Sequence, residues 1–243
     1  NVAFATESGK ITKTLNFKGA DNSAKAFGEA MIQVQKVLEK YSLSAIDAPF
    51  FTNHDTARAA GYFSKNPLKT KMAGGMNLMM SGNVFVYYGE EIGMSGSGKD
   101  ENKRAPMYWF DDYREGMTKG PYDMDKVEHS FGSVESQIND PLSIYNYYKR
   151  AIRLRNENPE IARGVITYMT EITDQDICAV ARSYNDSTIY MLYNISDEVK
   201  EVAVSKVTYS YEGIRGYLSA TGGEVTLTGE TVTMPPYSIV ILK

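Results

Sequence analysis

A short polar cluster, Asn53-His54-Asp55, directly follows an apolar run. The run, residues 48–52, is too short for a helix and predicts a buried strand whose carboxyl end presents these polar side chains. Parallel sheets and barrels bind their ligands at the carboxyl ends of the strands. An imidazole and a carboxylate at that place can hydrogen-bond a ligand. Because an aspartate beside a histidine is more often a structural pair, the cluster by itself leaves both interpretations open.

A second acidic pair, Glu90 and Glu91, follows another apolar run, residues 83–88. Neighbouring residues on an extended segment point to opposite faces, so these two carboxylates are poorly placed to act together. We expect them to pair with nearby arginines. The chain has only two histidines, which excludes a His-rich zinc site. No segment has the spacing of a calcium-binding loop, and the sequence predicts no metal site.

The elements that position these residues follow from the spacing of apolar side chains. Helices are predicted over residues 25–41, 67–81 and 141–156, and strands over residues 48–52 and 83–88. Asn66 and Asp140, each followed by proline, are typical helix starts. Strands and helices in alternation predict parallel βα units. The stretch 90–140 is polar with little periodicity, which indicates a long loop region, and such loops are usually functional or disordered.

The pattern changes near residue 164, where the apolar period falls from about 3.6 residues to 2. Short β-branched runs separated by turn residues then predict strands over residues 165–169, 177–183, 188–194, 201–204, 215–218, 224–227, 230–234 and 238–242. We therefore expect two domains, an α/β part over residues 1–162 and an antiparallel β-sandwich over residues 163–243.

Composition excludes some classes of function. The 243 residues carry 26 Lys and Arg against 30 Asp and Glu, a net charge of −4, so no cationic excess favours nucleic acid as a partner. No apolar run approaches the roughly 18 residues of a membrane helix, and no membrane association is expected. The single cysteine, Cys178, lies in an apolar run and is predicted to be a small buried hydrophobic residue.

Four motifs in order resemble the α-amylase superfamily of glycoside hydrolases. Residues 50–58 match F-x-x-N-H-D-x-x-R, and residues 82–91 are similar to G-x-P-x-[IV]-Y-Y-G-x-E, with Val84 in place of the proline. Residues 104–109 match R-x-P-M-x-W. Gln137, Asp140 and Ser143 match the approach to the last barrel helix. The resemblance implies the last βα units of a TIM (β/α)8 barrel, incomplete in this chain, followed by a small antiparallel β-sandwich.

The resemblance also implies roles for single residues. Asp55 corresponds to the catalytic carboxylate that binds the ring hydroxyls of the reacting sugar, and His54 to a histidine that contacts the same sugar. Further substrate-binding residues are expected in the same motifs and in the loop that borders the neighbouring subsites: Asn53, Arg58, Asp100 and Arg104. Trp109 is an alternative sugar-stacking residue. The expected substrate is an α-glucan such as starch or maltooligosaccharides.

The family's nucleophile and proton donor come from barrel strands four and five, and nothing upstream of Phe50 matches those motifs. Asp47 and Glu7 lack the strand context and are predicted to be loop residues. We therefore expect a retaining α-1,4-glucan hydrolase that needs an N-terminal barrel segment as its partner. The isolated chain is expected to be inactive, and unstable or prone to aggregation, because strand edges and apolar faces lie uncovered.

The resemblance leaves several alternatives open. An oligo-α-glucosidase or a glucosyltransferase of the same superfamily fits the R-x-P-M-x-W element as well. A non-catalytic carbohydrate-binding or interaction module is the alternative if residues 1–243 are the whole gene product. No cofactor is expected in this chain, although calcium is possible in the full-length protein. By resemblance to bacterial starch-degrading enzymes, an extracellular location, secreted or at the cell surface, is expected.

Overall fold

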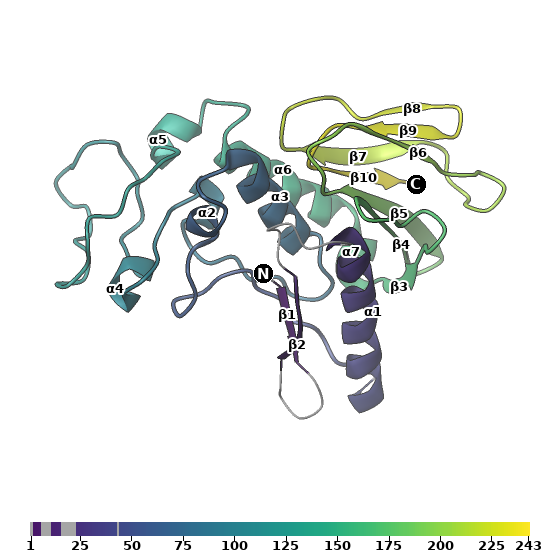
Figure 1. The fold of residues 1–243 in the computed structure, drawn as a ribbon, viewed down its shortest axis with the longest axis horizontal. Helices are drawn as coiled ribbons and strands as arrows, with labels where there is room; N and C mark the ends of the chain where they lie inside the picture. The colour runs from purple at the N-terminus through teal and green to yellow at the C-terminus, as the bar shows by residue number, and fades with distance from the viewer. Residues whose placement is uncertain (1, 6–10, 16–22, 43) are drawn as a thin grey trace.

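The computed structural model describes residues 2–5, 11–15, 23–42 and 44–243. The chain opens with an antiparallel hairpin of β1 (Val2–Ala5) and β2 (Ile11–Leu15), followed by the long helix α1 (Ser23–Tyr41). In Figure 1, α3 (Pro67–Leu78) and α6 (Ile144–Glu157) lie in the centre. The β-sandwich lies on one side of them, and an irregular region lies on the other.

The three long helices occur where the periodicity predicts them. At the start of α3 the Asn66 side chain accepts hydrogen bonds from the backbone N–H of Leu68 and Lys69, both at 3.0 Å. Helix α6 begins later than predicted, because Ser143 is its N-cap and accepts from Asn146 N at 3.1 Å. The Asp140 carboxylate instead closes a turn on Leu142 N at 2.8 Å. The prediction that Asp140 starts the helix is therefore wrong by one turn.

The two predicted parallel strands pair, but they do not form a regular ladder. Asn83 N donates to Asp47 O and Phe85 N to Pro49 O, each at 2.8 Å, and Phe50 and Phe85 form one isolated parallel bridge. Pro49 has no N–H with which to return a bond between these two, which explains why the ladder is interrupted there. The side chains of Phe50 and Phe85 are more than half exposed. This leaves an apolar edge facing solvent in the chain as described.

Gly82 permits the close approach of these two segments. Its φ is +78°, and a Cβ on it would lie 2.1 Å from the backbone oxygen of Asp47. Only glycine fits both the left-handed conformation and this contact. The turn before the second segment therefore depends on the absence of a side chain.

The stretch 90–140 is largely irregular, as predicted, with short helical turns. These are η1 (Glu90–Ile92), α4 (Asp100–Lys103) and α5 (Val134–Gln137), and a further short helix, α2 (Ala59–Tyr62), precedes α3. A small apolar cluster of Ile92, Met94 and Ala105 lies under this region. The region is thus folded around its own core, and it is long enough to carry residues such as Arg104 back towards the polar cluster at 53–55.

The C-terminal part contains every predicted strand. One sheet has the order β3-β4-β5-β10-β7 and the other β6-β9-β8, with antiparallel pairing throughout. The bounds are β3 Val165–Tyr168, β4 Ile177–Tyr184, β5 Ser187–Asn194, β6 Lys200–Ala203, β7 Ile214–Ser219, β8 Thr226–Thr228, β9 Thr231–Met234 and β10 Ser238–Leu242. Asn185 and Asp186, both at positive φ, form the tight turn between β4 and β5.

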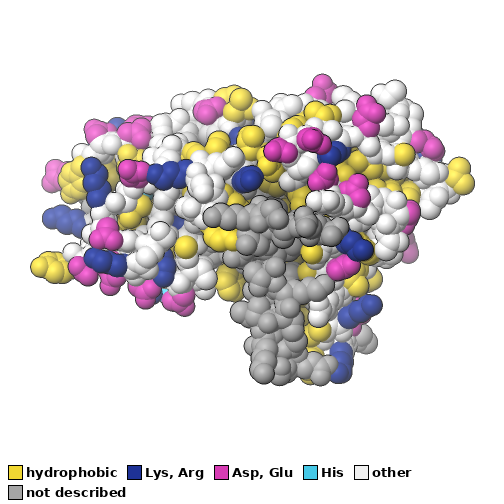
Figure 2. Space-filling view, viewed as in Figure 1, with side chains coloured by type: hydrophobic (Ala, Val, Ile, Leu, Met, Phe, Trp, Pro, Cys, Tyr) yellow, Lys and Arg dark blue, Asp and Glu magenta, His cyan; other side chains and the backbone are white. Residues whose placement is uncertain are grey.

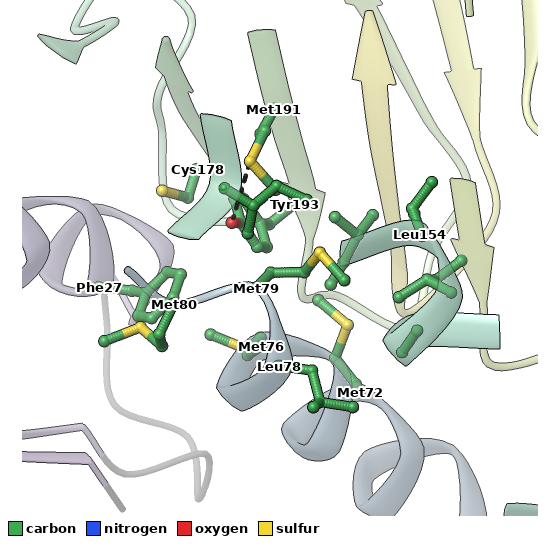
Figure 3. Packing of buried hydrophobic residues seen from close by; sticks show 14 of the residues in the cluster. Phe27, Met72, Met76, Leu78, Met79, Met80, Leu154, Cys178, Met191 and Tyr193 are labelled. Carbon is green, nitrogen blue, oxygen red and sulfur yellow. Dashed lines mark hydrogen bonds between the residues drawn. The ribbon is translucent and has the colours of Figure 1, made fainter. Parts of the chain in front are cut away.

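One hydrophobic cluster joins the helices to the larger sheet. Phe27 of α1 packs edge-on against Tyr193 of β5, with ring centroids 5.4 Å apart. Methionines of α3 and Cys178 of β4 lie in the same cluster (Figure 3), and the predicted burial of Cys178 is confirmed. The predicted domain boundary at 162/163 falls inside α7 (Pro159–Arg163), and this cluster takes side chains from both sides of it.

Two arginines bind the carboxyl end of α3. Arg155 of α6 donates to the carbonyls of Leu78 and Met80 at 2.7 and 2.6 Å and to that of Gly82. Burial lowers its pKa to about 10, so it stays charged at neutral pH. Arg182 of β4 is fully buried and donates to Met79 O at 2.9 Å and Ile161 O at 2.6 Å. The carbonyls that a helix end leaves without partners are satisfied by cations, which the helix dipole also favours.

We predict that Arg182→Met destabilises the protein by about 3 kcal/mol or more, because it leaves buried carbonyls without donors. The free energy of unfolding is measured in urea on the chain joined to an upstream barrel segment, here called the completed chain. Arg153→Met is the control, because Arg153 is 79% exposed and pairs with Glu157 on its own helix. An equal effect of the two substitutions contradicts the bridging role of Arg182.

Candidate active site

The polar cluster at 53–55 is held in a tight turn. The Asn53 side-chain oxygen accepts from the backbone N–H of Asp55 and of Thr56, both at 2.9 Å. The Asn53 N–H in turn donates to Thr56 Oγ1 at 3.0 Å. This is the turn that asparagine favours through its own side chain. The oxygen of Asn53 therefore holds the turn, and substrate binding by Asn53 stays a prediction.

Asp55 and His54 lie together at the surface, where a ligand can reach them. His54 Nε2 is 3.4 Å from Asp55 Oδ1, and the two side chains are 59% and 65% exposed. Arg104 Nη2 lies 3.6 Å from the same carboxylate oxygen. The structure thus brings together three of the predicted site residues. A carboxylate, an imidazole and a guanidinium side by side present both acceptors and donors to a polyhydroxylated ligand.

Arg104 links this group to Asp100. Arg104 Nη1 is 3.6 Å from Asp100 Oδ2, and Lys103 Nζ is 2.9 Å from Asp100 Oδ1. Hydrogen bonding to Lys103 and the charges of Lys103 and Arg104 lower the pKa of Asp100. Asp100 therefore remains ionised, one side chain away from Asp55. The predicted loop residues Asp100 and Arg104 thus lie beside the polar cluster.

Arg58 has a different place from the predicted one. It is fully buried, donates through Nε to Lys103 O at 3.1 Å and through Nη1 to Tyr88 O, and lies over the rings of Tyr87 and Tyr88. Burial lowers its pKa from the ordinary value. A side chain without exposed surface cannot contact a substrate from solvent. Arg58 therefore fixes backbone near the site, and its burial does not support the predicted contact with substrate.

Glu90 lies near the site and makes a contact with Thr52 that the sequence did not reveal. Its side chain is buried and accepts a hydrogen bond from Thr52 Oγ1, whereas we expected it to pair with an arginine. Burial raises its pKa to about 7, against the lowering effects of the Thr52 hydrogen bond and the Arg58 charge. Thr52 ends one parallel segment and Glu90 follows the end of the other, and these neighbouring positions are the signal that could have paired them.

The aromatic residues of the loop divide into exposed and packed ones. Trp109 is half exposed, so a sugar ring can reach it. Tyr108 stacks on His129 with centroids 4.0 Å apart, and burial lowers the pKa of His129. His129 thus packs against Tyr108.

The loop that carries Arg104 is tied down by ion pairs. Lys99 Nζ is 3.0 Å from Asp125 Oδ1, and Asn102 Nδ2 donates to Asp125 Oδ2 at 2.9 Å. Figure 2 shows basic and acidic side chains interspersed at the end of the molecule that carries α4. Pairs at the surface contribute little stability singly, but several together restrict the loop.

In the part of the chain that the structure describes, no group of three or more His, Cys, Asp or Glu side chains could hold a metal ion. None of the described helices is both long and apolar enough to cross a bilayer.

Comparison with known proteins gives the family. The profile described as "Alpha amylase, catalytic domain" matches residues 4–164. The chain belongs to the α-amylase family. Alpha-amylase 3 of Dictyoglomus thermophilum is 32% identical over 172 residues, which are 64% of this chain and 33% of that protein. Alpha-amylase SusG of Bacteroides thetaiotaomicron is 33% identical over 156 residues, 61% of this chain and 22% of that protein.

Solved structures give the same result. Amy13B of Eubacterium rectale superposes with a TM-score of 0.88 at 38% identity, covering 92% of this chain and 44% of that one. The α-amylase of H. orenii gives 0.73 at 27% identity, covering 90% of this chain and 44% of that one. The chain thus spans less than half of these proteins. The resemblance to the α-amylase superfamily is confirmed, as is the fold of closing barrel units followed by an antiparallel β-sandwich.

The buried Glu90 predicts a pH dependence of stability. Its pKa is raised on folding from 4.5 to about 7, so between these values the folded protein keeps a proton that the unfolded chain has lost. The stability contributed by this proton is complete below pH 4.5 and is lost as pH rises through about 7. The free energy of unfolding falls by up to about 1.4 kcal/mol per pH unit in this window.

In the Glu90→Gln variant of the completed chain, urea unfolding across this window is expected to lose that decline, because the amide does not titrate. Glu171→Gln, at an exposed position, is the matched control and is expected to keep it. If the free energy of unfolding of Glu90→Gln falls with pH at the same slope as that of the parental protein, another group is responsible for the titration.

Proposed function

We propose that this chain is the C-terminal part of a retaining α-glucan hydrolase of the α-amylase type, acting on the α-1,4 bonds of starch and maltooligosaccharides. The observation that carries the proposal is the exposed Asp55 carboxylate with His54 and Arg104 beside it, at the carboxyl end of two parallel segments. Family membership and the names of the relatives support the same substrate class.

The chemistry asks for a fixed carboxylate next to the reacting sugar. Glycosidic bond cleavage passes through an oxocarbenium-like state, and hydrogen bonds to the hydroxyls near the reacting carbon strengthen as positive charge develops. Asp55 accepts such bonds and His54 donates or accepts one. Because the turn at Asn53 and the guanidinium of Arg104 already hold Asp55, little reorganisation is needed when the charge appears.

The nucleophile and the proton donor belong to the upstream barrel segment in this proposal. Retaining enzymes need two carboxyl groups roughly 5–5.5 Å apart. Asp47 is a poor candidate for either, because it precedes the segment that Asp55 follows and its carboxylate caps Ala48 N at 2.8 Å. Glu7 lies outside the described residues. The isolated chain is therefore inactive in this proposal, and the barrel segment is its partner.

An oligo-α-glucosidase or transferase is the second candidate. Oligo-1,6-glucosidase of Bacillus cereus is 23% identical over 266 residues, covering 88% of this chain and 45% of that protein. The structure of trehalulose synthase MutB, at 18% identity, supports the shared fold alone. The higher identities to proteins named α-amylases, 32% and 33%, favour the first candidate.

We propose that the protein is secreted or held at a bacterial cell surface, because it resembles bacterial starch-degrading enzymes. We assign no calcium ligand to this chain and no step of the reaction to calcium, because the described residues offer no acidic cluster that fits this ion.

The Asp55→Asn variant of the completed chain is expected to lose about 10²–10³-fold in kcat on maltooligosaccharides, since an interaction made mainly in the transition state is removed. Steady-state kinetics measures this loss. Asp186→Asn, in the β4–β5 turn, is the matched control and is expected to keep the parental kcat. Undiminished turnover by Asp55→Asn refutes the assignment.

Products separate the two candidate activities. The completed chain is expected to release maltooligosaccharides from soluble starch and to leave isomaltose intact, which chromatography of the products shows. Efficient cleavage of isomaltose, or formation of new glucosidic bonds, instead supports the second candidate.

A further inference from the structure

Thr52 and Glu90 form a buried contact directly beneath the turn that carries Asp55. Thr52 Oγ1 donates to Glu90 Oε1, and both side chains are more than nine-tenths buried. Thr52 immediately precedes Asn53, and Glu90 opens η1 after the second parallel segment. The hydrogen bond therefore ties the residue just before the turn to the neighbouring segment, at a depth where water cannot replace it.

The turn couples the position of Asp55 to that of Thr52. Because the Asn53 side chain binds the N–H groups of both Asp55 and Thr56, residues 53–56 form one closed unit. A shift of Thr52 then moves Asn53 and Asp55 together. The position of the Asp55 carboxylate thus depends on the residue that precedes its turn.

The other end of the turn is anchored separately. Arg58 N donates to Gly96 O at 2.9 Å, and the Arg58 side chain binds the carbonyls of Tyr88 and Lys103. Lys103 directly precedes Arg104, which contacts Asp55. The turn is therefore fixed at both ends, and the Thr52–Glu90 hydrogen bond is the side-chain contact at its first end.

We infer that the Thr52–Glu90 hydrogen bond is a positioning contact that sets the placement of Asp55 for glycosidic bond cleavage, an inference that rests on the proposed function. Neither side chain reaches the substrate, and both act through the turn. Glu90 supplies the fixed acceptor, and Thr52 is the positioning residue of the turn. A displacement of about 1 Å at a reacting group can cost 10²-fold in rate, so the contact matters for turnover although it lies below the site.

The experiment compares Thr52→Val, which keeps the shape of the side chain and removes its donor, with Thr52→Ser, which keeps the donor. Both are made in the completed chain, in the parental and in the Asp55→Asn background. Thr70→Val is the matched control, because Thr70 is also buried and donates to a backbone oxygen, Asn66 O at 2.8 Å, away from the turn. The readouts are kcat and KM on a maltooligosaccharide.

We expect Thr52→Val to lower kcat about 10- to 100-fold with little change in KM, Thr52→Ser to restore most of the rate, and Thr70→Val to keep the parental rate. In the Asp55→Asn background, Thr52→Val is expected to cost nothing further, since it acts through Asp55.

Three results overturn the inference alone: parental kcat in Thr52→Val while Asp55→Asn is inactive, equal losses in Thr52→Val and Thr70→Val, or a loss that persists in full without Asp55. If Asp55→Asn itself keeps its turnover, the proposed function fails and this inference fails with it.

Discussion

The carboxyl end of α3 is the point on which the arrangement of the chain depends. A helix that ends inside a protein leaves backbone carbonyls that need donors. Arg155 and Arg182, one from α6 and one from the sandwich, supply them. The chain then leaves α3 through Gly82 and enters the segment that pairs beside residues 48–50. Both segments end at the polar site. The two arginines, which are distant from it in sequence, therefore fix the place where one of these two segments begins.

The site is accordingly a surface feature built on buried contacts. Asp55, His54 and Arg104 face solvent, whereas Thr52, Glu90 and Arg58 lie beneath them without exposed polar surface to offer a ligand. The exposed residues perform the proposed chemistry, and the buried residues hold them in position. A carboxylate that binds hydroxyls more tightly as charge develops must already be in place, and burial of the supporting hydrogen bonds provides that rigidity.

Much of this could be predicted from sequence, because strong patterns are local. The β-branched runs after residue 164 gave every strand of the sandwich, and four ordered motifs gave the family and the place of Asp55. Three features could not be predicted, because each depends on contacts distant in sequence or on a single atom. Pro49 interrupts the parallel ladder by lacking one N–H, the motif position of Arg58 does not reveal its burial, and Glu90 meets Thr52 only after the segments pair.

The solitary thiol gives the chain a practical property. Cys178 is completely enclosed by the cluster that joins helices and sheet, and burial raises its pKa well above the usual value for a thiol. Thiolate, the form that reacts with alkylating and labelling reagents, is therefore scarce and inaccessible in the folded state. A cysteine introduced beside the polar turn would be the accessible thiol of residues 1–243, and a fluorescent or spin probe attached there would report from that position without background.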